Sequence, residues 1–554
     1  MNILGNINAI PFMRRRGGKG TPFPFIPGMI CRYSAKGLTN EGMKTNPVWK
    51  DLTGNGHDLQ MKNFAWGGMS GVGGYKQDYK GNRWTYASSR ADIFYTGNFI
   101  NVTSVKTNSA QFYYQAYGGQ PSFTVPSYSV KVSGLVEGQN LDYRSSNGLI
   151  LNIKEDGIYR LPEFEFSANG GFYGFQLNKI QESCNITIEQ LPLYPGALVF
   201  DGVDDYGICE NFPILTKEKG YTVVALRQFL GSRNSFLISN RATGTAFSNG
   251  AFIFERFWEE SGAIFYNFGT PSDQLSLKPY SPFSYLTSKS YNGKATNAGD
   301  AVPSNTLLVG KSIINDSNPT NAAVWEICIL DHDATEEELT KIKDYFVKTY
   351  PWLFPDQAWT VVGKTNEDED RATIANITGN GNDLVLSNFG FAEGSGYNEE
   401  GECAGYLVTD GVDDKIDSSA FKMGEDFTVV GEWKLLPVSN YSYAGIIKTN
   451  NLYVYNNASI GISIYVCSSG VRNDMEGLKS LKAICSDGRV YGEDWTEYKL
   501  SIGRTKGAQS SLYLGYNSKA YTKIAFKNLA IYPTVLSRED CIKAYNYLQT
   551  LKAK

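Results

Sequence analysis

The heptapeptide Thr53-Gly54-Asn55-Gly56-His57-Asp58-Leu59 returns almost unchanged, 325 residues later, as Thr378-Gly379-Asn380-Gly381-Asn382-Asp383-Leu384. A second string, Asp201-Gly202-Val203-Asp204-Asp205, returns 209 residues later as Asp410-Gly411-Val412-Asp413-Asp414. Because the offset falls from 325 to 209, the first copy carries about 116 residues that the second lacks. Later landmarks keep a nearly constant offset, 206 at Tyr221 and Phe427 and 202 at Thr335 and Ser537. The chain therefore contains two copies of one module, the first of them interrupted.

The repeated module is predicted to be rich in β-strands. Runs such as 221–226 and 427–433 are dominated by β-branched and aromatic residues and are bounded by Gly, Asn and Ser. Each copy then ends in one helix. Thr335 to Glu338 forms a T-x-x-E capping box, and Ser537 to Asp540 forms the weaker S-x-x-D version. A strand-rich body with one terminal helix is typical of a β-sandwich with a helix packed on it.

The extra segment of the first copy also reads as β-structure, with short apolar runs separated by Asn-Gly and Asp-Gly turns. We therefore predict an all-β chain of two concanavalin A-like β-sandwiches, each closed by a short C-terminal helix, the first interrupted by an inserted β-sandwich domain. The predicted boundaries are an extended arm at 1–29, module one at 30–79 plus 196–349, the insert at 80–195, a linker at 350–357 and module two at 358–554.

Composition excludes several classes of protein. Aromatic residues make up 14% and charged residues 19% of the 554 residues, which excludes an intrinsically disordered chain. The formal net charge of −4 predicts no polyelectrolyte binding to nucleic acid or to an anionic membrane. No apolar run approaches the ~18 residues that span a bilayer, so we expect no membrane insertion. Eight scattered Cys residues without a C-x-x-C pair, and a start without signal-peptide features, predict synthesis in a reducing cytoplasm.

The first 29 residues differ from the module that follows them. A basic Gly-rich stretch is followed by Pro alternating with aromatic residues, which favours an extended arm without a core of its own. Leaving these apolar side chains exposed is costly, so we predict an anchor that becomes ordered on a partner surface. The anchoring residues would be Arg14, Arg15, Arg16, Phe23, Phe25 and Ile26. The apolar connector 350–355 should fix the two modules against each other.

Three sets of residues carry a family resemblance: the string Asp51 to Asp58, the string Leu198 to Tyr206, and the closing T/S-x-x-E/D helix. Together they resemble the concanavalin A-like (LamG-like) jelly-roll family, over roughly four fifths of the chain. The paired Gly-x-Thr-Asn-Glu and Thr-Gly-Asn-Gly-x-Asp signatures look most like modular virion proteins of tailed phages, especially the crAss-like group. That resemblance implies a head-fibre, tail-fibre or capsid-decorating role, located in the virion.

Two acidic strings are candidate calcium ligands, as in some lectin-like sandwiches. They are Asp201, Asp204 and Asp205 in the first copy and Asp410, Asp413 and Asp414 in the second. The alternative is a tight turn whose carboxylates cap backbone N–H groups, which we favour. Asp51, Asn55 and Asp58 form a second oxygen cluster, but Asn376 replaces Asp51 in the second copy and Asn382 replaces His57. We interpret this cluster as an Asx-type turn.

Glycan binding needs aromatic platforms with amide or carboxylate groups nearby. The candidates are Trp66, Tyr113, Tyr114, Tyr117 and Trp258. The stretch 112–120 is the best of them locally, since it combines aromatic residues, amides and flexible glycines.

Enzymatic sites are less well supported. The E-x-D-x-x-E string of related glucanases is absent, and with two histidines a Ser-His-Asp triad is improbable. We therefore predict no enzymatic activity, no certain cofactor, and a phage virion protein that presents lectin-like domains to host or mucosal glycans. It would be a homo-oligomer attached to capsid, portal or tail proteins. The alternatives are a bacterial surface glycan-binding protein, a purely structural virion spacer and a polysaccharide depolymerase.

Overall fold

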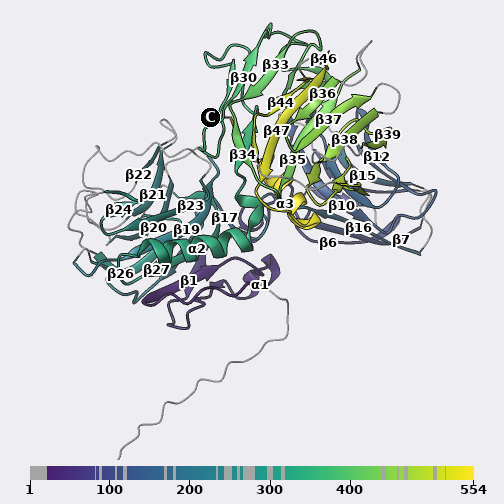
Figure 1. Cartoon of the computed structure of the whole chain (residues 1–554). Helices are drawn as coiled ribbons and strands as arrows, with labels where there is room; N and C mark the ends of the chain where they lie inside the picture. The colour runs from purple at the N-terminus through teal and green to yellow at the C-terminus, as the bar shows by residue number, and fades with distance from the viewer. Residues whose placement is uncertain are drawn as a thin grey trace, which may run out of the picture.

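Figure 1 shows a computed structural model of the chain, which is built mainly of β-strands. The structure describes residues 21–553 except 82, 87–89, 107–108, 117–121, 167–170, 179–182, 217, 232–234, 242–252, 259–262, 266–280, 296–302, 313–318, 438–443, 458–460, 467–471, 503–507 and 518–519. The described helices are α1 (Asn40–Thr45), α2 (Glu336–Thr349), α3 (Arg538–Leu548) and the 3-10 turns η3 (Pro351–Leu353) and η4 (Gly401–Cys403). The all-β prediction is confirmed. Within the described part of the chain, no helix is long and apolar enough to cross a membrane.

Module one consists of two facing antiparallel sheets. The first has the order β25 (Lys294–Ala295), β24 (Ser290–Tyr291), β23 (Phe283–Thr287), β19 (Thr222–Phe229), β27 (Asn321–Leu330), β17 (Leu198–Asp201) and β4 (Gly71–Val72), and β1 (Met29–Ser34) also pairs with β27. The second has the order β2 (Val48–Trp49), β3 (Leu59–Lys62), β18 (Tyr206–Cys209), β26 (Pro303–Val309), β20 (Ser235–Arg241), β21 (Ile253–Trp258) and β22 (Ala263–Phe265). Inward side chains of both sheets, such as Trp49, Phe200 and Ile327, form one apolar core.

Module two repeats this arrangement. One sheet has the order β31 (Gly396–Asn398), β32 (Tyr406–Val408), β47 (Ile524–Tyr532), β35 (Thr428–Leu435), β40 (Ala483–Cys485), β41 (Arg489–Tyr491) and β42 (Glu497–Lys499), with β28 (Gln357–Thr360) on β47. The other has the order β29 (Thr373–Ile374), β30 (Leu384–Ser387), β33 (Lys415–Ser418), β44 (Tyr513–Leu514), β36 (Ala444–Lys448), β37 (Leu452–Asn457), β38 (Gly461–Val466) and β39 (Asn473–Glu476). Two small ladders join β34 (Phe421–Met423) to β43 (Ala508–Ser510) and β45 (Tyr516–Asn517) to β46 (Ala520–Tyr521).

The internal repeat extends to the register of the strands. In module one β19 pairs with β27, and the register shifts between Leu226 and Arg227. In module two β35 pairs with β47, and the register shifts between Glu432 and Trp433, 206 residues further along. Such a bulge bends and twists the strand that carries it. Its presence at the same place in both copies confirms that the two sandwiches are copies of one module.

Two further sheets lie between β4 and β17 in the sequence. One has the order β13 (Gly157–Leu161), β10 (Tyr128–Ser133), β16 (Ser183–Gln190), β7 (Phe99–Val105) and β6 (Ala91–Tyr95). The other has the order β12 (Gly148–Ile153), β11 (Asn140–Ser145), β15 (Phe172–Asn178), β8 (Ser109–Gln115) and β5 (Trp84–Tyr86), and β14 (Phe164–Phe166) pairs with β9 (Phe123–Val125). These sheets share their own apolar core, so they form an inserted β-sandwich.

The insert leaves and re-enters module one at a single point. Strands β4 and β17 are direct neighbours, with Leu198 opposite Val72. Beyond them the Gly73 N–H donates to Ala197 O at 2.8 Å and the Tyr194 N–H donates to Gly73 O at 2.9 Å. The two ends of the insert are therefore held side by side, as at the mouth of a hairpin. This geometry explains why module two can close the equivalent pair, β31 and β32, with a short connection.

Both closing helices begin as the sequence predicts. The Thr335 side chain accepts from the Glu338 N–H, and the Glu338 carboxylate accepts from the Thr335 N–H at 2.9 Å, which completes a capping box. Ser537 Oγ accepts from the Asp540 N–H at 3.1 Å. Each cap satisfies N–H groups that a helix N-terminus otherwise leaves unpaired. The helices thus start where their apolar faces can pack onto the sheets.

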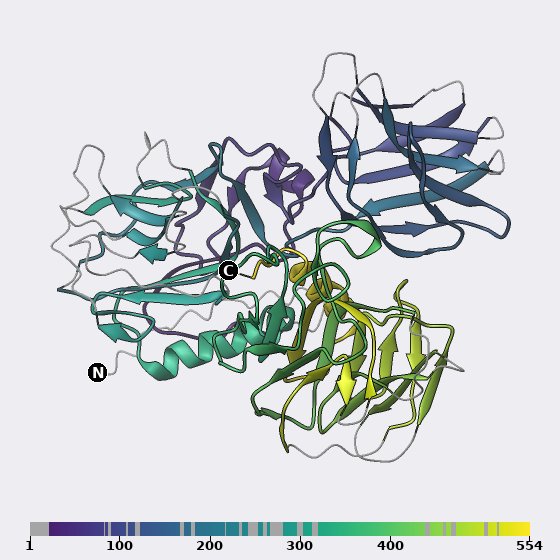
Figure 2. The ribbon, with the colours of Figure 1, turned by 90° about the horizontal axis from the view of Figure 1, so that it is seen from above.

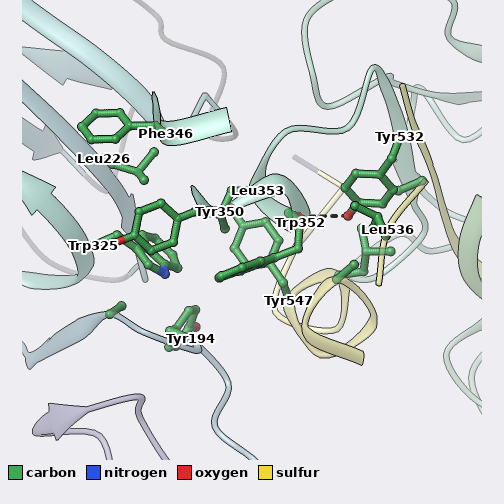
Figure 3. Packing of buried hydrophobic residues seen from close by; sticks show 14 of the residues in the cluster. Tyr194, Leu226, Trp325, Phe346, Tyr350, Trp352, Leu353, Tyr532, Leu536 and Tyr547 are labelled. Atoms are coloured by element: carbon green, nitrogen blue, oxygen red, sulfur yellow. Dashed lines mark hydrogen bonds between the residues drawn. The ribbon is translucent and has the colours of Figure 1, made fainter. Parts of the chain in front are cut away.

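A large apolar cluster, which we call the central cluster, joins the two modules (Figure 3). It contains the connector residues Tyr350, Trp352 and Leu353, all at most 5% exposed, together with residues of α2 and α3. The Tyr532 hydroxyl donates to Trp352 O at 3.0 Å, and the ring of Tyr547 lies 6.1 Å from that of Trp325. The apolar connector is therefore buried between the modules instead of acting as a hinge.

The insert also contacts module two. Figure 2 shows three lobes, with the insert in blue and module two in green and yellow next to each other. Ile158 on β13 belongs to the central cluster, and Ser129 Oγ on β10 donates to Asn546 Oδ1 on α3 at 3.1 Å. Burial raises the pKa of Glu432, but the nearby cations Lys482, Lys527 and, from the insert, Arg160 lower it to about 2. This contact uses the β13–β10 side of the insert.

We expect the substitution Trp352→Ala to lower the free energy of unfolding by about 3–5 kcal/mol, because it empties a site filled from both modules. Urea denaturation followed by circular dichroism and tryptophan fluorescence measures the change. Phe25→Ala is the matched control, since that ring is 86% exposed, and it should alter the same quantity by less than about 0.5 kcal/mol. Equal effects of the two substitutions would show that the central cluster does not stabilise the fold.

Candidate functional site

The acidic string of module one forms a compact turn between β17 and β18. The Val203 N–H donates to Asp201 Oδ1 at 2.7 Å, and the Asp201 N–H donates to Asp205 Oδ2 at 3.0 Å. Ser70 Oγ donates to the other oxygen of Asp205 at 3.0 Å. Asp205 is fully buried, whereas Asp204 is exposed. The carboxylates therefore hold a turn together by accepting hydrogen bonds from the backbone.

The corresponding turn of module two has the same hydrogen bonds. The Val412 N–H donates to Asp410 Oδ1 at 2.8 Å, and the Asp410 N–H donates to Asp414 Oδ2 at 2.7 Å. Ser395 Oγ donates to Asp414 Oδ1 at 3.1 Å. Asp414 is only 1% exposed and Asp413 is exposed. The structure confirms the interpretation of both strings as capping turns.

Each turn also brings three carboxylates together, with oxygens within 4.8 Å of one another. Calcium prefers six to eight oxygen ligands. Both oxygens of the buried Asp205 and one oxygen of Asp201 already accept hydrogen bonds from N–H or O–H donors, and the second copy does the same. These hydrogen bonds give the carboxylates a structural role, and calcium binding at the two turns stays a prediction.

The second oxygen cluster is an Asx-type turn. Asp51 accepts from the Thr53 N–H at 3.0 Å and from the His57 N–H at 3.2 Å, and Asp58 accepts from the Asp51 N–H at 2.9 Å. In module two Asn376 accepts from the Thr378 N–H at 3.1 Å. An amide oxygen thus replaces the carboxylate without loss of the turn. His57 contacts the ring of Phe212 at 5.3 Å.

The predicted aromatic platform residues do not form one surface. Trp66 stacks on Phe64 at 4.7 Å and packs against the core of module one. Tyr114 stacks on Tyr173 at 5.0 Å, on the core side of the insert. Both rings cover part of the chain's own apolar surface and remain half-buried, so their role in glycan binding stays a prediction. Trp258 ends strand β21, and Tyr117 lies outside the described residues.

Tyr113 differs from these residues because it lies on the outer face of the insert. Successive side chains of a strand point to opposite faces of a sheet. On β8, Ala110, Phe112 and Tyr114 contact the core, so Gln111, Tyr113 and Gln115 face outward. Across the sheet, Gln176 lies opposite both Gln111 and Asp142, and Tyr113 lies opposite Gly174. The register therefore aligns outward polar residues from β8, β15 and β11.

The outward side chains form a surface that we call the amide face: Gln111, Tyr113, Asn140, Asp142, Arg144, Asn152, Gln176 and Asn178. Side-chain hydrogen bonds join the seven residues other than Tyr113. The Asp142 carboxylate accepts from the side-chain amides of Asn140, Asn152 and Asn178 at 2.5–2.9 Å. Gln111 Nε2 donates to Gln176 Oε1 at 2.7 Å. All of these side chains are half-buried. Such a network fixes the orientation of its donors and acceptors before any ligand arrives.

Arg144 has a hydrogen-bond donor that its neighbours on the amide face do not use. One of its terminal nitrogens donates to Gln176 Oε1 at 2.8 Å, but its Nε is buried without a hydrogen-bond partner among the described residues. Beside it, Gly174 is buried, and a Cβ there would lie 2.5 Å from Phe112 O, so the backbone fills the space where a side chain would begin. The ring of Tyr113 lies 5.6 Å from that of Phe172. The aromatic, amide and guanidinium groups therefore lie beside a strand position that admits only glycine.

The sequence predicts Tyr113 as a candidate site residue, but not its neighbours on the amide face. The signal was present, because Asn140, Asp142 and Arg144 alternate with core residues, as do Gln176 and Asn178. Their convergence depends on strand pairings between segments more than 30 residues apart, which the sequence does not reveal.

The predicted anchoring residues divide into three groups. Arg14, Arg15 and Arg16 lie outside the described residues. Ile26 is 4% exposed within the central cluster, and Phe23 lies 4.8 Å from the ring of Tyr345 on α2. This corrects the prediction for Phe23 and Ile26, because module one itself buries their apolar surface. Phe25, between them, is 86% exposed and keeps the predicted availability.

No known family profile matches this chain, and no curated protein sequence does. Among solved structures, a Trypanosoma rangeli sialidase bound to 2,3-difluorosialic acid is 9% identical, with a TM-score of 0.26, and the match covers 83% of this chain and 84% of the sialidase. Domain 4 of an extracellular arabinanase from Geobacillus stearothermophilus, in complex with arabinotriose, is 14% identical with a TM-score of 0.23, over 34% of this chain and 98% of that domain. The binding domain of botulinum neurotoxin serotype D is 10% identical with a TM-score of 0.23, over 63% and 89% of the two chains.

These comparisons correct one prediction. Sialidases and an arabinanase are enzymes that act on carbohydrate, so the prediction that this chain is not an enzyme is contradicted. The identities and TM-scores are too low to transfer the role of any residue. None of the three proteins is described as a virion component.

The buried carboxyls of the two turns predict a dependence of stability on pH. Burial, together with the charge of Asp201, raises the pKa of Asp205 to about 7, and burial raises that of Asp414 to about 6. An aspartate in an unfolded chain has a pKa of about 3.9, so between about pH 4 and 7 the folded protein binds more protons. The free energy of unfolding should therefore fall as pH rises through this window.

Urea denaturation at intervals from pH 4.5 to 8 measures this slope. Asp205→Asn should reduce it, because the amide does not titrate, while the exposed neighbour Asp204→Asn should change it only by the small contribution of the Asp204 charge to the pKa of Asp205. A wild-type slope in Asp205→Asn would mean that Asp205 titrates normally.

Proposed function

We propose that this chain is a virion protein of a tailed phage, a fibre or capsid-decorating protein, that binds host or mucosal glycans through the amide face of its insert. The virion role rests on the resemblance of the duplicated signatures. The binding role rests on one observation, the preorganised cluster of amides, Arg144 and Tyr113 on an outer sheet face.

The chemistry of the amide face suits the hydroxyl groups of sugars. Side-chain amides donate to and accept from vicinal hydroxyls, a carboxylate accepts from them, and a tyrosine ring packs against the apolar face of a pyranose. Asp142 and Arg144 carry opposite charges on the same face of β11. The surface therefore has no net charge, which favours neutral sugars. A homo-oligomer that displays several copies would add avidity to weak individual sites.

The proposed attachment to the virion uses the N-terminal arm. Residues 1–20 contain the basic stretch, and the exposed Phe25 follows it. Because Phe23 and Ile26 are packed on module one, the arm begins from a fixed point on α2 and the central cluster. The partners would be capsid, portal or tail proteins.

A glycan array with the purified full-length protein, displayed multivalently, tests the binding role. We expect Tyr113→Ala and Arg144→Met to lower the apparent affinity by about tenfold or more, since hydrogen bonds to charged groups contribute about 1.5–3 kcal/mol. Phe94→Ala and Lys131→Met are matched controls, because both side chains are exposed on the other sheet of the insert. Equal losses in the controls, or no binding at all, would contradict the proposal and favour a structural spacer.

The same array, repeated with EDTA, separates the aspartate turns from the amide face. Binding that survives chelation agrees with the proposed site, whereas binding that requires calcium would assign the turns to the ligand. Incubating the bound glycans with the protein and assaying new reducing ends distinguishes simple binding from depolymerisation.

Deletion of residues 1–20 tests the attachment. We expect the shortened protein to keep its unfolding temperature, because Phe23 and Ile26 remain, but to be lost from purified virions. Deletion through residue 29 is a poor test, because it also removes buried Ile26 and the first residue of β1. Full incorporation of the protein without residues 1–20 would locate the anchor elsewhere.

A further inference from the structure

Module two carries a second surface that resembles neither the aspartate turns nor the amide face. It lies on the sheet that runs from β29 to β39, on the side away from the core. The core of module two contains Leu452, Val454, Ile462 and Ile464 of β37 and β38, so the residues between them face outward. Helix α3 packs on the other sheet, against β35 and β47. The outer face of β36–β38 is therefore not covered by the closing helix.

Strand register places five residues side by side on this face, which we call the tyrosine row: Asp417, Tyr513, Lys448, Tyr453 and Tyr465. Each residue lies opposite the next on a neighbouring strand, from β33 across β44, β36 and β37 to β38. Tyr455 extends the row along β37. Cross-strand neighbours on one face are close enough for their side chains to interact.

The aromatic rings of the row stack on one another. The ring centroid of Tyr453 lies 5.1 Å from that of Tyr455 and 6.4 Å from that of Tyr465, with interplanar angles of 24° and 10°. Tyr455 and Tyr465 are 5.7 Å apart. Asn517 Nδ2 donates to the Tyr453 hydroxyl at 2.7 Å, which fixes that ring. Tyr455 is only 1% exposed, whereas Tyr453 and Tyr465 are half-buried, so only these two rings of the rigid stack reach the surface.

Lys448 places a positive charge at the centre of the row. Its ammonium lies 5.9 Å from the ring centroids of both Tyr453 and Tyr513. Among the described residues it has no carboxylate within ion-pair distance. Two carboxylates on the same face of the sheet have other partners, since Asp417 accepts from the Tyr516 hydroxyl at 2.8 Å and Asp474 pairs with Arg472 at 2.6 Å. The ammonium is therefore oriented by aromatic rings and not neutralised by an acid.

We infer that the tyrosine row is a second carbohydrate-binding site, and that its ligand is an oligosaccharide with an anionic group on the sugar ring. Stacked tyrosines provide apolar surface and hydroxyls for successive sugar rings. A half-buried ammonium without an acidic partner favours a ligand that brings the missing negative charge. Carboxylate and sulfate groups share this chemistry. The site is independent of the amide face, whose charges are balanced and whose residues belong to the insert.

Titration calorimetry on the full chain with three probes tests this inference. The probes are hexagalacturonic acid, the same hexasaccharide with its carboxyls reduced, and a sulfated carrageenan hexasaccharide. We expect an anionic probe to bind at least about tenfold more tightly than the reduced one, and Lys448→Met to remove that difference, because a charge-assisted hydrogen bond is lost. Binding of the sulfated probe alone, with the same dependence on Lys448, would identify sulfate as the anion.

Three controls make the result specific. Lys422→Met removes an exposed lysine of β34 in the same module and should leave every affinity unchanged. Lys448→Arg keeps the charge and should retain most of the preference for the anionic probe. Tyr465→Ala should weaken binding of all probes, and its unfolding temperature shows whether the sheet is intact.

Tyr113→Ala and Arg144→Met separate this site from the amide face, since neither should affect binding of the anionic probes. The inference is overturned if neither anionic probe binds more tightly than the reduced one, if Lys448→Met binds like wild type, or if none of the three probes binds.

Discussion

Burial of the central cluster is the interaction on which the arrangement of the whole chain depends. A β-sandwich with one closing helix satisfies its own core, so two such modules could be joined by a loose linker. Here the connector itself, through Tyr350, Trp352 and Leu353, enters an apolar core that α2 and α3 complete. The insert adds Ile158 to the same cluster. Apolar burial scales with the area removed from water, so one contiguous cluster couples the positions of three domains.

The sequence predicts those features of the structure that depend on nearby residues or on the internal repeat. Thr335 and Glu338 stand three residues apart, so a capping box could be predicted without knowledge of the fold. The duplicated strings predicted two copies of one module, because a repeat constrains topology directly. The aspartate turns also followed from their own sequence, since their hydrogen bonds span two to four residues.

Features that depend on contacts between distant segments could not be predicted from the sequence. Tyr113 and Tyr114 are neighbours in sequence, yet one faces outward and the other enters the core, and only strand parity separates them. The amide face needs four strands in register, and the tyrosine row needs five. The sequence predicts that Phe23 and Ile26 contact another protein, but in the structure both residues pack against module one.

The stem of the insert, where β4 and β17 pair directly, has a consequence for how this protein can change. Because both ends of the insert leave from one ladder, a different domain with closely spaced termini would fit there, and module two shows that the ladder also closes with a short connection. One sheet of the insert, however, also contacts module two, so that sheet cannot be exchanged freely. Its β13–β10 side is tied to α3 through Ser129 and Asn546, whereas the amide face lies on the other sheet. Residues on the sheet that carries the amide face can therefore vary in evolution, while the opposite sheet, which contacts α3, stays constant.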